Sequence, residues 1–335
     1  MAKRSSDRLN YLAYVGFRVI TFLFHLFPIN WNLRTARFFG WLWYKLLKRH
    51  RQRALEHLRF AYGDSLSEKE LERIALRSCQ QMAMMAIELL FSPKLITPWT
   101  WAKYIRVGPE ITEPIRYLIE GKSGVIMVTG HYGNWELLGY AMAAVGLDIA
   151  AVMRPLDNPY LNDYTVRTRG AGGLRLIYKK GMSEIAEEIL QKGGSVGFIA
   201  DQNAGHKGLF VDFFGRKAST YKSIGLLARE YNVPIMIGCA RRVSDRFEYE
   251  VEVTRIIWPS EWQGKENEVL WITQEYTRAI EQFVRKDPSQ YLWVHRRWKT
   301  RPPEELQAKA EEQPAATGND TEDNDDPRQK MACQS

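Results

Sequence analysis

The chain has 335 residues, of which 45% are hydrophobic, enough to fill the core of one large domain or two small ones. This content excludes a disordered chain, and three cysteines without Cys-x-x-Cys spacing indicate neither a disulfide framework nor a cysteine zinc site. The net charge of +8 is uneven: residues 1–60 carry twelve bases and two acids, whereas the tail from Pro303 carries nine acids and three bases. The basic block favours a phosphate-bearing partner, which could be nucleic acid, an anionic lipid surface or a phosphorylated substrate.

The first sixty residues are also unusually apolar. Tyr11 to Phe27 is an apolar, aromatic-rich run about one membrane span long at best. A second segment, Trp31 to Leu47, has a similar apolar and aromatic composition with more basic residues. The polar members of the first run recur at spacings of three and four, which places them on one stripe of a helix: Tyr11, Tyr14, Arg18, Thr21 and His25. We expect residues 1–60 to form membrane-anchoring or interfacial helices. The alternatives are a buried core hairpin or a signal sequence, although no small-residue cleavage site follows.

Residues 61–303 show the sequence pattern of an α/β domain. A helix is expected over 67–90, opened by a capping box at Ser67 and Glu70. Short β-branched runs indicate strands at 124–129, 148–153, 174–178, 195–200, 233–243, 247–256 and 291–298. Helical patterns lie between them at 135–145, 182–191, 217–231 and 265–286. This alternation predicts a largely parallel central sheet flanked by helices, followed from residue 304 by an acidic disordered tail.

The strongest candidate for a catalytic site is the segment from Gly130 to Glu136, Gly-His-Tyr-Gly-Asn-Trp-Glu. It follows a strand of the buried type, and Gly130 and Gly133 permit a tight loop before a helix that Asn134 can cap. His131 then lies on the loop, with Glu136 in the first helical turn and able to reach the imidazole. A carboxylate on one ring nitrogen raises the basicity of the other, an arrangement that removes a proton from a hydroxyl group.

Several properties of this segment bear on its chemistry. The amino end of the helix offers backbone N–H groups to a developing oxyanion, for which we consider Gly130, Gly133 and Asn134. No serine or cysteine nucleophile motif accompanies the histidine, and the scattered histidines do not suit a metal site, so neither a metal nor a cofactor is expected. The alternative is that Glu136 only complements the helix dipole and His131 is an ordinary loop residue.

Other polar residues follow the predicted strands, at the edge where an α/β enzyme places its site. The candidates for substrate binding are Arg154, Asn158, Arg169, Asp201 and Gln202. Arg154 suits phosphate binding, and Arg169 could extend a phosphate clamp. Each also has a structural alternative: a salt bridge for Arg154, a solvated surface position for Arg169 and a cap for Asp201.

Five ordered motifs together resemble a known family, the late acyltransferases of lipid A biosynthesis, which include lauroyl and myristoyl transferases related to lysophospholipid acyltransferases. The motifs are Gly130 to Glu136, Arg154-Pro155 with Asn158-Pro159, Ala200-Asp201-Gln202, Phe213 to Arg216 with Ala218 and Thr220, and Gln290 to Pro302. The resemblance covers most of residues 10–303, whereas the acidic tail is outside it.

The resemblance implies more than the residues alone. It implies that His131 and Glu136 form the catalytic dyad, that acyl carrier protein carries the acyl donor and that a phosphorylated glycolipid is the acceptor. It also implies an enzyme held by membrane lipids on the cytoplasmic face of the inner membrane. In this interpretation His131 deprotonates the hydroxyl of a 3-hydroxyacyl chain, Arg154 holds acceptor phosphate, and Asp201 orders the loop or a sugar hydroxyl. Phe213 and Phe214 would line an acyl groove or belong to the core.

Other functions fit parts of the sequence. The same dyad could acylate another glycolipid, such as an inositol mannoside, or use acyl-CoA as the donor. A catalytically idle peripheral protein could bind anionic lipid through residues 1–60. A nucleic-acid partner is disfavoured, because the basic residues are interleaved with an almost continuous apolar surface.

Overall fold

The fold is described from a computed structural model that places residues 7–108, 111–120, 123–178 and 182–305. Its centre is a seven-stranded sheet of order β1-β9-β8-β2-β5-β3-β4. The strands are β1 (Ile105–Val107), β2 (Val125–Thr129), β3 (Ile149–Met153), β4 (Arg175–Tyr178), β5 (Ser195–Ile199), β8 (Ile235–Arg242) and β9 (Tyr249–Ile257). All neighbouring strands are parallel except β8 and β9. The prediction of a largely parallel α/β sheet is confirmed, and the predicted acidic tail lies outside the described residues from 306 onward.

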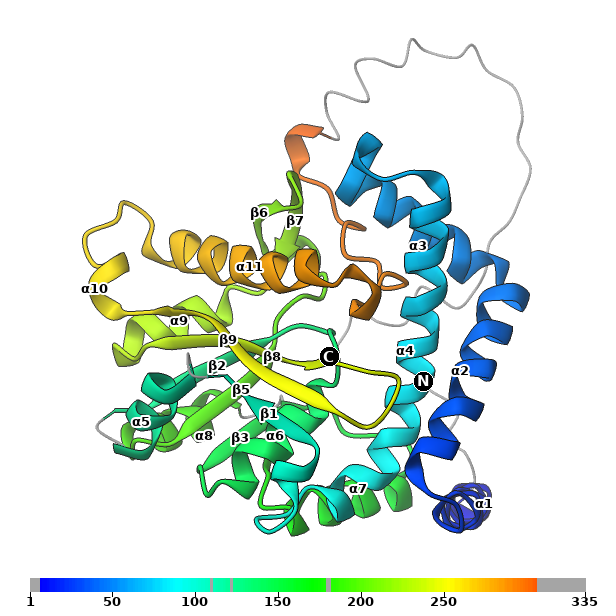
Figure 1. The fold of residues 1–335 in the computed structure, drawn as a ribbon. Helices are drawn as coiled ribbons and strands as arrows, with labels where there is room; N and C mark the ends of the chain where they lie inside the picture. Colours follow the sequence, from blue (N-terminus) through cyan, green and yellow to red (C-terminus); the bar gives the residue numbers. More distant parts are fainter. Residues whose placement is uncertain (1–6, 109–110, 121–122, 179–181, 306–335) are drawn as a thin grey trace.

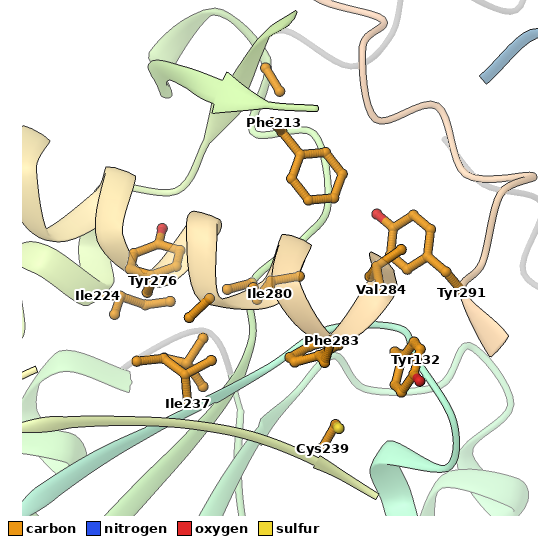
Figure 2. Close-up of a cluster of buried hydrophobic side chains, with 14 of the residues drawn as sticks. Tyr132, Phe213, Ile224, Ile237, Cys239, Tyr276, Ile280, Phe283, Val284 and Tyr291 are labelled. Atoms are coloured by element: carbon orange, nitrogen blue, oxygen red, sulfur yellow. The ribbon is translucent and has the colours of Figure 1, made fainter. Parts of the chain in front are cut away.

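Helices cover both faces of the sheet. On one face lie α8 (Met182–Gln191), α9 (Ser223–Tyr231) and α11 (Glu268–Lys286). The apolar stripe of α11 supplies Ile280 and Phe283, which pack above Ile237 and Cys239 of β8, as Figure 2 shows. On the other face lie α5 (Thr112–Glu120) and α6 (Trp135–Ala144), and α7 (Pro159–Ala171) connects β3 to β4. Two faces covered by helices are what a parallel sheet requires, because both of its sides are apolar.

Four amino-terminal helices lie beside the sheet, near the end where β2 and β8 finish (Figure 1). They are α1 (Asp7–His25), α2 (Ile29–Leu46), α3 (Lys48–Tyr62) and α4 (Glu68–Leu95). The predicted capping box opens α4, because Ser67 and Glu70 bond to each other through side chain and backbone. Helix α2 packs closely on α4 at Gly40, where a Cβ atom would come within 2.5 Å of the Gln80 Cα atom. Only glycine permits this approach.

The length and hydropathy of these helices show whether any of them could span a membrane. Among the described residues, no single helix is both long enough and apolar enough to cross a membrane. Helices α1 and α2 reach the required length and hydropathy together, but they are bent by 119° at the break between them.

Shorter elements complete the fold. They are the hairpin of β6 (Leu209–Phe213) and β7 (Arg216–Thr220), the short helix α10 (Pro259–Trp262), and the 3-10 turns η1 (Gly63–Ser65), η2 (Trp101–Lys103), η4 (Gly205–Lys207) and η5 (Pro288–Gln290).

Two sequence-based assignments were wrong, and several elements, α7 among them, were not predicted. The predicted helix 217–231 begins only at Ser223, because the residues before it pair as β7 with β6. No strand forms over 291–298, where an isolated bridge joins Tyr132 to Tyr291. There the backbone N–H groups of Trp293, His295 and Arg297 bond to carbonyl oxygens two or three residues earlier, so the segment forms turns and pairs with no neighbouring strand among the described residues beyond that bridge. The Arg297 side chain is buried and donates to the Ser219 carbonyl oxygen at 2.6 Å. Helix α7 was not predicted, although Asn158 caps it and Pro159 occupies its first position.

Candidate active site

The loop after β2 has the predicted strand-loop-helix form. Gly133 has a φ of +57°, and a Cβ atom there would come within 2.0 Å of the Ala240 carbonyl oxygen, so the loop requires glycine. The Asn134 side chain accepts a hydrogen bond of 2.9 Å from the Leu137 N–H and caps α6, as expected. The loop therefore presents His131 at the carboxyl end of β2, with Glu136 in the first turn of the helix.

The carboxylate that contacts the His131 ring is Asp201, which corrects the expectation that Glu136 would do so. The Asp201 Oδ1 atom lies 2.7 Å from His131 Nδ1, and Oδ2 accepts a 2.9 Å hydrogen bond from the His131 backbone N–H. The sheet register explains this pairing. Thr129 at the end of β2 lies opposite Ile199 at the end of β5, so the residues two positions further on each strand also face each other. The expectation that Asp201 orders the loop is thereby met in the structure.

Asp201 sets the charge state of the pair. Burial would lower the pKa of His131, but the charge and hydrogen bond of Asp201 outweigh it, so that pKa lies above its ordinary value. Burial would raise the pKa of Asp201, but the adjacent imidazole lowers it to about 2. The carboxylate therefore stays ionised, and a neutral His131 carries its proton on Nδ1, facing Asp201. Nε2 is left as the basic nitrogen.

Polar and aromatic groups surround the rest of the imidazole. The Gln202 Nε2 atom lies 3.2 Å from His131 Nε2, which puts the predicted binding residue Gln202 beside the basic nitrogen. The Trp135 ring stands edge-on to His131 at 4.8 Å between centroids, and His295 lies parallel to it at 6.3 Å. Burial lowers the pKa of His295 to about 4, so at neutral pH this second imidazole adds no positive charge beside the first.

Glu136 forms an ion pair with Arg169 of α7. Its Oε1 atom lies 2.6 Å from Arg169 Nη2, and both side chains are largely buried. Burial raises the pKa of Glu136, and the charge of Arg169 opposes that shift. The structure thus brings together two predicted site residues, Glu136 and Arg169, but they bind each other instead of His131 and a phosphate. Glu136 influences His131 only through its charge, the smallest of the named effects on the pKa of that imidazole.

The predicted oxyanion donors are engaged within the protein. The Gly133 N–H donates to the Gln290 carbonyl oxygen at 3.1 Å, and the Asn134 N–H donates to the Ala240 carbonyl oxygen at 3.0 Å. These bonds fix the loop against the end of β8 and the segment after α11. Because both hydrogens are used, these two groups do not serve an oxyanion, which corrects that part of the prediction. Gly130 instead lies tightly against Asp201, where an added Cβ atom would be 3.4 Å from the carboxylate.

A large apolar cavity opens beside His131. Its volume is about 670 Å³, and it lies between the sheet and helices α5 and α6. The cavity reaches His131, Glu136 and Arg169 at one end, whereas Leu118, Met127 and Met142 line its interior. Its size and chemistry suit a long hydrocarbon chain whose polar end lies at the imidazole. Sequence patterns gave no sign of the cavity, because its lining comes from many separate elements.

The other predicted site residues lie at the rim or in the framework. Arg154 lines the cavity mouth and has an exposed salt-bridge partner, Asp157, whose Oδ1 atom lies 3.9 Å from its Nη2 atom. The Arg154 side chain is 86% exposed, so its guanidinium can also meet a ligand. Asn158 accepts hydrogen bonds from the N–H groups of Tyr160 and Leu161 and donates to the Asn10 carbonyl oxygen. That side chain ties α7 to α1, and we do not assign it to substrate. Phe213 and Phe214 are buried in the main core, which decides between the two roles that the sequence left open.

Comparison with known proteins identifies the family of this chain. A family model described as bacterial lipid A biosynthesis acyltransferase matches residues 2–300. The chain belongs to this family. It is 30% identical over 288 residues to the lipid A biosynthesis myristoyltransferase of Escherichia coli, covering 82% of this chain and 81% of that protein. It is 24% identical over 300 residues to the lipid A biosynthesis lauroyltransferase of Escherichia coli, with 87% and 92% covered. It is 26% identical over 272 residues to a lipid A biosynthesis acyltransferase of Haemophilus influenzae, with 79% and 83% covered.

Membership confirms the family resemblance and the enzyme class: the chain is an O-acyltransferase.

Sequence reasoning missed one buried residue that holds the loop of His131. Glu88 of α4 is fully buried and accepts hydrogen bonds from Asn134 Nδ2 at 2.9 Å, Arg242 Nη2 at 2.6 Å and the Tyr249 hydroxyl at 2.5 Å. Because Asn134 faces a carboxylate, its amide nitrogen must point to Glu88 and its oxygen to the helix. The available signal in the sequence was a single acidic residue, Glu88, inside an otherwise apolar run from Met82 to Phe91.

Proposed function

We propose that this acyltransferase moves a fatty acyl chain from an acyl carrier protein thioester to a hydroxyl group of a phosphorylated lipid A precursor. The observation that carries the proposal is the His131–Asp201 pair at the mouth of an apolar cavity. The names of the relatives supply the acceptor class. Basic residues near the site also suit an acyl carrier protein, which is acidic, so the same charge can serve docking of donor and acceptor.

The reaction begins with proton removal by His131. Its Nε2 atom takes the proton from the hydroxyl of a 3-hydroxyacyl chain as the oxygen attacks the thioester carbonyl carbon. Asp201 holds the Nδ1 hydrogen and stabilises the imidazolium that forms. When the tetrahedral intermediate collapses, the carbon–sulfur bond breaks and the imidazolium returns its proton to the leaving thiolate. Ester and free thiol are the products, and no covalent enzyme intermediate is required.

The cavity and its ion pair define the donor side of the site. The apolar cavity holds the hydrocarbon chain of the donor, which places the thioester near His131. We assign Arg169 to the negative charge that develops on the carbonyl oxygen, with Glu136 keeping the guanidinium in the cavity wall. Glu136 thus acts as a positioning residue rather than as the partner of the imidazole.

The acceptor approaches from the rim. Arg154, exposed at the mouth of the cavity, is suited to bind acceptor phosphate. Helices α1 and α2 expose a broad apolar surface that favours attachment to the inner membrane at its cytoplasmic face, where lipid acceptor and soluble donor can meet.

The decisive experiment is an acyl-transfer assay with the purified full-length chain. The protein is incubated with a tetra- or penta-acylated lipid A precursor and with acyl carrier protein thioesters of several chain lengths. The masses of the products are then measured by mass spectrometry. We expect a mass gain of one acyl group, lost in His131→Ala and retained in His206→Ala, whose histidine is exposed in a turn. Absence of any mass gain with every donor would refute the assigned substrates. Transfer from acyl-CoA but not from the carrier protein would refute the donor alone.

A further inference from the structure

Helix α1 lies against the catalytic domain along its length. Near its start, Asn10 accepts a hydrogen bond from Asn158, and in its middle the Phe17 ring packs edge-on against Tyr164 of α7. Near its end, His25 stacks on Phe91 of α4 at 4.4 Å between ring centroids. The predicted polar stripe therefore faces the protein. A helix held in this way cannot also extend away from the domain through a bilayer.

The opposite face of α1 and the corner that follows it are apolar and exposed. No Asp, Glu, Lys or Arg occurs between Arg18 and Arg34. Large apolar side chains that are at least half exposed in this interval are Val19, Ile20, Phe22, Leu23, Leu26, Phe27 and Trp31. Such a contiguous patch marks an interaction surface. Arg18 does not interrupt it, because its guanidinium donates to the Tyr14 hydroxyl and lies over the Tyr164 ring.

At the corner between α1 and α2, one side chain lies within hydrogen-bond distance of three backbone carbonyl groups. The buried amide nitrogen of Asn32 lies 2.9, 3.1 and 3.4 Å from the carbonyl oxygens of Phe24, Phe27 and Pro28. In water such carbonyl groups at a helix end could bond to solvent, whereas in hydrocarbon they need a donor from the protein. An apolar corner with an internal donor for its carbonyl groups is therefore suited to burial in lipid.

We propose that α1 and α2 form a wedge that enters a single leaflet of the bilayer and returns to the same side, with the Asn32 corner as its deepest point. This inference rests on the proposed membrane location. The wedge excludes a transmembrane span: both ends of the helix pair stay on the side of the catalytic domain. Arg34 and Lys45 on the exposed side of α2 reach the headgroups through their long side chains.

The wedge has a consequence for catalysis, because α1 also forms part of the active site. Phe17 of α1 and Tyr164 of α7, which contact each other, both line the catalytic cavity. Insertion of the apolar face of α1 into lipid therefore brings the cavity mouth to the membrane surface. The acceptor can present its hydroxyl to His131 without leaving the bilayer.

Cysteine labelling tests the topology. In a Cys333→Ala background, where Cys79 and Cys239 are buried, single cysteines replace Arg8, Leu26 and Gln52. Sealed spheroplasts and inside-out membrane vesicles are treated with a membrane-impermeant maleimide. We expect labelling at positions 8 and 52 only in inside-out vesicles, and at position 26 only after detergent is added. Labelling of position 8 in spheroplasts would show a span and overturn the wedge. Labelling of position 26 without detergent would show that the corner lies outside the lipid.

The corner itself is tested by Asn32→Leu, which keeps the size of the side chain and removes the donor. The matched control is Thr35→Val, which removes a hydroxyl from the neighbouring turn of α2. We expect binding to phosphatidylethanolamine–phosphatidylglycerol vesicles to fall about tenfold for Asn32→Leu and to change less than about twofold for the control. Equal binding by both variants would contradict the role of Asn32.

His131→Ala separates this inference from the proposed function. It is expected to label as the wild type does while it loses acyl transfer. A wild-type protein that labels as the wedge predicts but transfers no acyl group to any acceptor would therefore refute the function alone.

Discussion

His131 Nδ1 and Asp201 Oδ1 lie 2.7 Å apart although 70 residues separate them in the chain. Each residue stands two positions beyond the end of its strand, and the two strands are parallel neighbours in the middle of the sheet. The orientation of the imidazole therefore depends on the register of β2 and β5. Neither Gly133 nor the helix cap contributes directly to this contact.

Replacing Asp201 by asparagine is expected to slow transfer and to change its pH dependence. Burial lowers the pKa of His131 and Asp201 more than compensates, so the pKa of the wild-type imidazole is raised. Only the neutral imidazole acts as a base, so kcat/KM of the wild type falls as the pH drops through that raised pKa. Asp201→Asn removes the charge, so the acid limb should move to lower pH, and the rate should fall about 10²–10⁴-fold.

The measurement is a pH profile of kcat/KM for both proteins, with Asp212→Asn as the control. Asp212 is an exposed carboxylate paired with Lys217 on the β6–β7 hairpin. An Asp201→Asn enzyme with an unchanged acid limb and rate would show that this carboxylate does not orient the base.

Replacing Glu136 by glutamine distinguishes the observed partner from the one that the sequence suggested. The carbonyl oxygen of the introduced glutamine can still accept the hydrogen bond from Arg169, so the guanidinium should keep its place. Because a neutral acceptor is weaker by about 1 kcal/mol, we expect the rate to fall less than about tenfold and the acid limb to move little. If Glu136 were the orienting carboxylate, Glu136→Gln would match Asp201→Asn in both rate and pH profile.

A valine at Gly197 is expected to shorten the preferred acyl chain. Gly197 is in the middle of β5 and lines the cavity, and a Cβ atom there would have only ordinary contacts, 3.7 Å from the Ala150 oxygen and the Ile149 side chain. Valine suits a strand, so the fold should tolerate it while the cavity loses room. One methylene group is worth about 1–3 kcal/mol in such a pocket, so selectivity should shift about tenfold or more toward shorter donors.

The assay compares kcat/KM for carrier-protein donors that differ by two carbons. Gly170→Val serves as the control, because that glycine is exposed on α7 and has no neighbour near an added Cβ atom. An unchanged order of preference in Gly197→Val would mean that the chain does not occupy this part of the cavity.

Local patterns were enough to predict the framework around the site. A strand of the buried type, a glycine that requires positive φ and an Asn cap are adjacent in sequence, and the segment from β2 to α6 formed as expected. The turn and the cap are local features, although the folded loop is also held by bonds to Ala240, Gln290 and Glu88, which are distant in the chain. The polar stripe of α1 was also correct as one face of a helix, because residues at spacings of three and four lie on the same side. That this side packs against α7 was evident only from the structure.

Contacts between distant segments were beyond local patterns. Asp201 was recognised as a residue that follows a strand, but its pairing with His131 required the order of strands in the sheet. Glu136 was the nearer carboxylate in sequence, yet Arg169 on another helix attracts it. The segment 291–298 has the residue types of a strand, but several of its backbone N–H groups bond within the segment, in turns that place Arg297 against the β6–β7 hairpin.

The buried contact between Asn134 and Glu88 allows a test of how the catalytic loop is held. Serine is as good an N-cap as asparagine, so Asn134→Ser should keep the cap of α6 while it breaks the link to Glu88. A hydrogen bond to a buried charge contributes about 1.5–3 kcal/mol, and we expect the free energy of unfolding to fall by that amount. A shift of the loop would also displace Trp135 and His131. We therefore expect kcat to fall about tenfold or more, with little change in KM.

The same exchange at Asn267 isolates the effect of the link. Asn267 caps α11 through the N–H of Leu270, with the three-residue spacing of Asn134 and Leu137, but it is exposed. Asn267→Ser should therefore change stability by a few tenths of a kcal/mol and leave kcat as it is. Chemical unfolding and steady-state kinetics on both variants make the comparison. If the two serine variants behave alike, α4 does not hold the catalytic loop through Glu88, and the loop depends on its own turn and on Asp201.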